Sequence, residues 1–214
     1  MTSPQDALEP DQAIPDGLWE RLRADPLRAP EHLALAAAQR HGPAAAAWVA
    51  ERTGRYAVDA RELALMAKKR HAALARVEGA ATGIGGFVTL VPDLAALAWI
   101  QSRLVFFVAG AYGYDPLDRM RPAELLVLRD LYPDPPAARR ALDGIGTPVA
   151  QAFVGSRMAG EQALATRLAL MVGRHGFERI AGRLVPGFAI AFNAIVNERD
   201  TRRLADRAIA FYGG

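Results

Sequence analysis

The fold of this protein is decided by the stretch PDLAALAWIQSRLVFFVAGAY, residues 92–112. Only Asp93 and Arg103 are charged in it, and apolar side chains lie nearly all round a helix of this length, which is typical of a buried helix. The longest charge-free run in the sequence is 14 residues, below the roughly 18 needed for a membrane span. We therefore expect a central core helix, about 30 Å long.

A second helix is predicted immediately before it, over residues 59–82. Asp59 suits the N-cap, and Glu62 stands where a capping box needs an acidic side chain. Apolar residues then recur at helical spacing and predict a core-facing stripe: Leu63, Met66, Leu74 and Val77. We expect this helix and the one at 92–112 to form an antiparallel hairpin, enclosed by protein, with its few ionic groups satisfied inside.

Proline and glycine divide the rest of the chain into shorter predicted helices. Their ranges are 30–41 and 43–53, ended by Gly42 and Gly54, then 122–131, 135–143, a bent segment reaching 172, 174–183, 186–196 and 200–212. No alternating strand pattern occurs, so the predicted fold class is all-α: a compact multi-helix bundle with a central buried hydrophobic helix at about 92–112. Residues 1–58 are expected to form an N-terminal arm with a short helical appendage, and residues 59–214 the main helical domain.

Composition excludes several classes of function. The 214 residues include no cysteine, which rules out disulfides, thiolate metal sites and cysteine nucleophiles. The net charge is only +3 and charges of both signs are interspersed, so no nucleic-acid partner is expected. The four histidines lack metal-ligand spacing, so no metal is predicted. Residues 1–12, MTSPQDALEPDQ, do not form a signal peptide, which favours the cytoplasm.

Two segments resemble one known family. Residues 71–116 read HAALARVEGAATGIGGFVTLVPDLAALAWIQSRLVFFVAGAYGYDP, and residues 185–212 read VPGFAIAFNAIVNERDTRRLADRAIAFY. The first combines Glu-Gly-Ala-Ala-Thr-Gly, a glycine-rich turn, Pro-Asp-Leu, a long apolar helix with Gln-x-Arg, and Tyr-Gly-Tyr-Asp. This succession resembles the EcsC family of bacterial proteins, and the similarity covers roughly residues 60–213.

The resemblance implies a helical fold and a link to membrane transport, because the family is named after the third member of an operon that encodes an ABC transporter involved in secretion. It implies no catalytic residue and no cofactor. The partners it suggests are a lipid, a membrane surface or a membrane transport protein. Its oligomeric state is left open.

The candidate site residues are polar side chains in apolar surroundings: His71, Glu78, Asp93, Gln101, Arg103, Asn193 and Asn197. In the predicted hairpin Glu78 lies opposite about Leu97, within reach of Gln101 or Arg103. A buried carboxylate is costly unless it is paired. The first interpretation is therefore a structural network that fixes the hairpin, with Asn193 and Asn197 as core amides. The second is a polar pocket in which a carboxylate binds a ligand or acts as a base.

The aromatic residues near the central helix leave a similar choice between core packing and an apolar cleft or membrane-docking face. The leading functional prediction is a non-enzymatic protein, cytoplasmic or peripheral to the inner face of the membrane, that binds a lipid, a membrane surface or a transport component. The alternatives are a hydrolase-like enzyme that uses Glu78 or Asp93, and a protein-interaction adaptor that uses residues 1–58.

Overall fold

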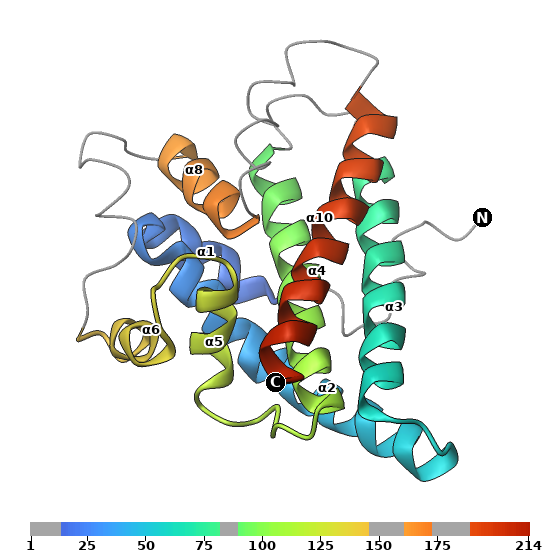
Figure 1. The fold of residues 1–214 in the computed structure, drawn as a ribbon. Helices are drawn as coiled ribbons and strands as arrows, with labels where there is room; N and C mark the ends of the chain where they lie inside the picture. Colours follow the sequence, from blue (N-terminus) through green and yellow to red (C-terminus); the bar gives the residue numbers. More distant parts are fainter. Residues whose placement is uncertain (1–13, 82–89, 146–160, 173–188) are drawn as a thin grey trace.

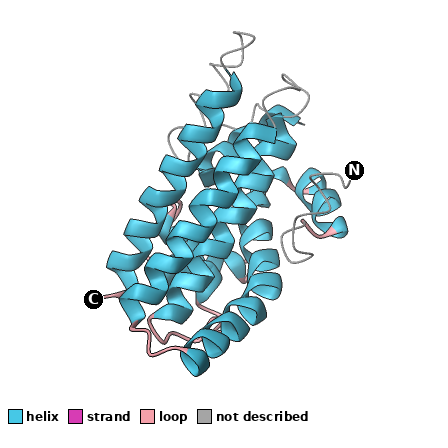
Figure 2. Cartoon of the chain, turned by 90° about the vertical axis from the view of Figure 1, so that its right-hand side faces the viewer, coloured by secondary structure: helices cyan, strands magenta, loops and turns pink. Residues whose placement is uncertain are grey.

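The computed structural model describes residues 14–81, 90–145, 161–172 and 189–214, which form a helical bundle with no strand among them (Figures 1 and 2). The elements are α1 (Asp16–Ala24), the 3-10 turn η2 (Pro26–Arg28), α2 (Ala29–Arg55), α3 (Ala60–Ala81), α4 (Leu90–Ala111), α5 (Arg121–Leu128), α6 (Pro135–Leu142), α8 (Glu161–Val172) and α10 (Ala189–Tyr212). The all-α prediction is confirmed.

Helix α4 lies at the centre of the bundle. Helices α2, α3, α8 and α10 all pack against it, and every residue from 101 to 111 is buried (Figure 1). Pro92–Ala111 is long and apolar enough to cross a membrane, yet 89% of its apolar window is covered by the rest of the protein. The core helix of a soluble protein has the same properties, and the predicted central buried helix is confirmed.

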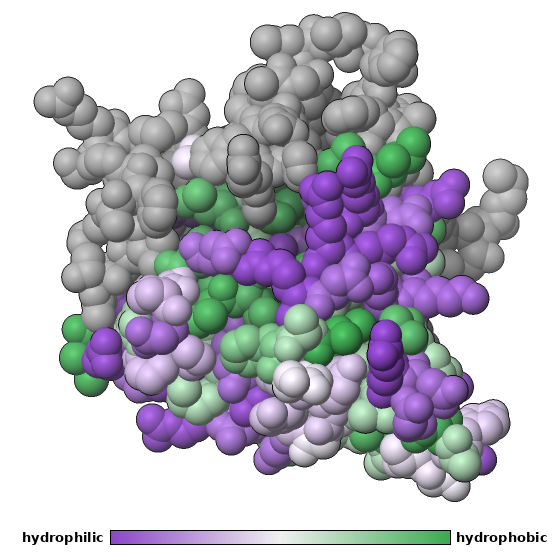
Figure 3. Space-filling model, in the orientation of Figure 1, coloured by the Kyte–Doolittle hydropathy of each residue, from purple (hydrophilic) through white to green (hydrophobic). Residues whose placement is uncertain are grey.

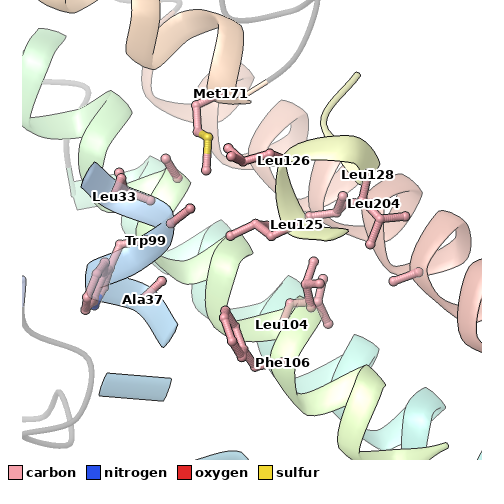
Figure 4. Packing of buried hydrophobic residues seen from close by; sticks show 14 of the residues in the cluster. Leu33, Ala37, Trp99, Leu104, Phe106, Leu125, Leu126, Leu128, Met171 and Leu204 are labelled. Atoms are coloured by element: carbon pink, nitrogen blue, oxygen red, sulfur yellow. The ribbon is translucent and has the colours of Figure 1, made fainter. Parts of the chain in front are cut away.

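Side chains from both ends of the chain meet on α4. Figure 4 shows Trp99, Leu104 and Phe106 of α4 within one apolar cluster. Around them the figure labels Leu33 and Ala37 of α2, Leu125, Leu126 and Leu128 of α5, Met171 of α8 and Leu204 of α10. Leu18 and Leu22 of α1 are fully buried in the same cluster. Helices α1 and α2 therefore share the core of the main domain.

The first prediction that the structure corrects is the break at residue 42. Helix α2 continues through Gly42 and Pro43, although an internal proline costs about 3 kcal/mol. Pro43 is exposed, so the carbonyl of Gln39 that loses its helical partner can bond to water. Burial of Leu33 and Trp48 on either side stabilises the continuous helix. Gly42 allows a close approach instead: a Cβ there would lie 2.9 Å from the backbone oxygen of Pro116.

The second correction concerns residues 197–200, where two helices were expected and one, α10, is found. Asp200 was expected to cap a new helix. It is instead buried within α10, 3.9 Å from Arg203. The next residue, Thr201, accepts a hydrogen bond of 3.1 Å from Nε2 of Gln101 on α4. These tertiary contacts outweigh the local preference of Asp200 for a helix start.

Helix α3 begins as predicted. Oδ1 of Asp59 accepts a bond of 2.7 Å from the Glu62 amide, and the Asp59 amide donates to Oε2 of Glu62 at 3.4 Å, which completes the capping box. Its packing is different from the prediction. Leu63 is buried, but Met66 and Val77 are exposed, so α3 has an open outer face, while its inner face packs against α4 and α10.

Candidate functional site

The predicted site residues are divided between two regions. Gln101, Arg103 and His71 are buried, as is Asn197. Asp93 lies half-buried in the first turn of α4. The side chains of Glu78 and Asn193 lie outside the described part of the structure. Among the described candidates, Gln101 belongs to one network and His71 and Arg103 to another, and the pocket of all seven residues stays a prediction.

Gln101 belongs to a network that joins four helices. Its amide donates to Thr201 of α10, and its carbonyl oxygen accepts from Nη2 of Arg129, at the end of α5. Nη1 of Arg129 also donates to the Val172 carbonyl at the end of α8, at 3.4 Å. Burial lowers the pKa of Arg129 to about 9. The amide of Gln101 thus holds helices together. Arg129 belongs to this network but was not among the predicted site residues.

His71 and Arg103 belong to the second network, the histidine–aromatic cluster of His41, His71, Trp99, Arg103 and Phe107. The guanidinium carbon of Arg103 lies 4.8 Å from the centre of the Phe107 ring. The His71 ring meets the same phenyl ring at 5.0 Å, and the His41 ring lies 4.4 Å from that of Trp99. Three helices, α2, α3 and α4, contribute to this cluster.

Both histidines of the cluster are held in the neutral state. Nδ1 of His71 donates to the Ala67 carbonyl at 2.8 Å in the tautomer that this distance requires. Burial, with a smaller contribution from Arg103, lowers the pKa of His71 to about 3. Burial and the same guanidinium lower the pKa of His41 well below its usual value. The cluster is therefore suited to packing near neutral pH and sensitive to acid.

His41 was not among the predicted site residues, because the sequence placed it at the end of a short helix. It lies mid-helix in α2, fully buried. Among the residues that the structure describes, no group of three or more His, Cys, Asp or Glu side chains could hold a metal ion.

A different feature lies on the surface, at the corner where α2 meets α3. It is a groove of about 530 Å³, which we call the α2–α3 groove, lined by Arg52, Tyr56, Val58, Glu62, Leu65, Met66 and Lys69. Tyr56 is 55% exposed, Leu65 45% and Met66 39%. In Figure 3 hydrophobic and hydrophilic residues lie side by side over this corner, at lower right. A sequence signal for it was Leu65, which lies about 200° round the helix from Leu63, so the two leucines cannot share one face.

The two basic residues that line the groove differ from other basic residues of α3 in their ion pairs. Lys68 forms an ion pair with Asp206 of α10, and Arg76 lies 3.7 Å from Glu198. Lys69 and Arg52 have no ion pair with any described residue. The groove's acidic residue, Glu62, is engaged in the capping box. With two cations and one carboxylate, the groove combines an apolar surface with a net positive charge.

Comparisons with known proteins give one relationship. Neither the curated proteins nor the solved structures that were searched contain a match. The sequence profile of the EcsC protein family, in contrast, matches residues 57–213, from the start of the α3 segment to the end of α10. Most of the groove lies within this range, and Arg52 and Tyr56 lie just before it. Because the match covers most of the chain, the protein belongs to the EcsC protein family.

Proposed function

We propose that this protein binds peripherally to membranes that contain acidic lipids, through the α2–α3 groove and the outer face of α3. The observation that carries the proposal is a face of α3 with six exposed apolar or basic residues, Leu65, Met66, Lys69, Ala73, Arg76 and Val77, and one exposed acidic residue, Glu62. At 3.6 residues per turn they fall within about 120° of the helix circumference. Apolar and basic side chains on one helix face are typical of helices that lie in a membrane interface.

The energetics favour shallow docking. The inner face of α3 packs against α4 and α10, so only the outer face is available to lipid. Each Lys or Arg near an acidic leaflet contributes about 1 kcal/mol of binding free energy, and each apolar side chain adds the free energy of leaving water. Acidic lipids give the cytoplasmic leaflet its negative surface potential, so we place the protein at the inner face of the membrane.

Vesicle flotation tests the proposal. The full chain should float with vesicles that contain an acidic phospholipid and much less with neutral phosphatidylcholine vesicles, and salt should release it. Replacing Leu65 and Met66 together by Glu should abolish flotation. Leu117→Glu is the control for a negative charge at an exposed apolar residue, because Leu117 is 60% exposed but lies in the loop between α4 and α5. Absence of flotation with acidic vesicles, or equal loss in the control, would contradict membrane docking through α3.

A further inference from the structure

We infer that the α2–α3 groove is a binding site for one single-chain anionic amphiphile of the fatty-acid type. The acyl chain lies along the apolar residues of the groove, and the carboxylate lies between Arg52 and Lys69. This inference rests on the proposed function in using the same surface, and it adds a defined ligand to it.

The dimensions of the groove suit one small ligand. Its volume of about 530 Å³ falls within the range of about 300–1,000 Å³ that is typical of small-molecule sites. Glu62 and Lys69 lie seven residues apart on α3, which corresponds to about 10 Å along the helix. Tyr56 and Val58 line it from the connection between α2 and α3, and Leu65 and Met66 from α3 itself. Methionine adapts its shape to flexible chains, which suits an acyl ligand.

The charges of the groove favour an anionic head. Arg52 lines the groove and has no ion pair with a described residue, and a carboxylate is the partner that a guanidinium binds most strongly. Lys69 supplies a second positive charge. Glu62 contributes one negative charge to the lining, so the two cations leave the groove with a net charge of +1.

The first test measures the affinity of the full chain for monomeric fatty acids of eight to fourteen carbons, each below its aggregation concentration, by titration calorimetry. Each methylene that enters an apolar site raises the affinity about fourfold. We expect this rise until the groove is full, followed by a plateau. Methyl esters of the same chains should bind about fivefold more weakly or worse, because they lack the charge. Affinity that is independent of chain length would overturn the inference.

Variants then locate the site. Met66→Trp should fill the groove and lower fatty-acid affinity at least tenfold, whereas Leu117→Trp should not change it. Lys69→Glu should lower the affinity at least fivefold, and Arg140→Glu, the same charge change on the exposed side of α6, should not. Circular dichroism shows whether each variant is folded. Equal loss in the test and control variants would overturn the groove as the site.

The two proposals can fail separately. If the protein floats with acidic vesicles but binds no monomeric fatty acid, membrane docking stands and the ligand inference is wrong. If it binds monomers with the expected chain-length dependence but does not float, the groove is a ligand site and membrane docking is wrong. If Met66→Trp abolishes monomer binding and leaves flotation intact, both proposals hold, with the groove and the outer face of α3 contributing separately.

Discussion

The inner and outer faces of α3 contain similar residue types in opposite roles. On the inner face His71 donates to the Ala67 carbonyl of its own helix and packs on Phe107, and it is neutral. On the outer face Lys69, two residues before it, has no ion pair with any described residue and lines an apolar groove. The polar side chain on the inner face is neutral and bonded within the core, whereas the charge on the outer face is available to a ligand. The function of this helix is therefore expected on the side that its own protein does not use.

The largest expected effect comes from acid, which acts on the inner face. The pKa of His71 is lowered by burial from its model-compound value of 6.5 to about 3, and that of His41 is also well below 6.5. Below pH 6.5 the unfolded chain binds more protons than the folded one, so the free energy of unfolding falls as the pH falls from 6.5 towards 3. His71 contributes up to about 1.4 kcal/mol per pH unit in that window, and His41 adds a contribution of the same sign.

Urea unfolding at a series of pH values measures this slope. The variant His41→Phe/His71→Gln should be less stable than the parent at pH 7, because packing changes, but its stability should depend less on pH below 6.5. An unchanged slope in this variant would show that the acid sensitivity comes from other groups. Above about pH 8 neither histidine should contribute to the pH dependence, because both are then neutral in the folded and the unfolded state.

The next effect compares two leucines on opposite faces of α3. Leu63 is fully buried at 1% exposure, whereas Leu65 lines the groove. Leu63→Ala removes packed methyl groups from the core and should lower the free energy of unfolding by about 2–5 kcal/mol. Leu65→Ala should change it by less than about 0.5 kcal/mol. Denaturant unfolding gives both values, and a cost above about 1.5 kcal/mol for Leu65→Ala would mean that the outer face is covered.

The two faces also show what sequence patterns can establish. The low charge of residues 92–112 was enough to predict the central helix, and Asp59 with Glu62 was enough to predict where α3 begins, because both signals are local. The same local logic failed at Pro43 and Asp200, where packing on α4 and the bond from Gln101 to Thr201 override the helix breaks.

For the site, the harder prediction was which side of α3 faces the core. A helix with leucine at 63 and 65 and methionine at 66 offers more than one apolar stripe, and only the positions of α4 and α10 decide which one is buried. The groove is also lined by Arg52 of α2 and by Tyr56, which directly follows α2. How close these two residues come to α3 depends on the turn between the two helices. Gln101 and His71 were correctly recognised as polar residues in apolar surroundings, but their partners Arg129 and His41 lie far away in sequence.

The smallest stability effect distinguishes neighbouring lysines. Lys68 is mostly buried and pairs with Asp206 of α10, so Lys68→Gln should cost up to about 1 kcal/mol of unfolding free energy and leave lipid binding unchanged. Lys69→Gln removes a charge that pairs with no described residue, so stability should change by less than about 0.5 kcal/mol. Binding to acidic vesicles should weaken about fivefold, which corresponds to about 1 kcal/mol for one basic residue near the surface. Flotation and urea unfolding of both variants measure this. If Lys68→Gln weakened vesicle binding as much as Lys69→Gln, net charge would govern the interaction, and the division between the two faces of α3 would not hold.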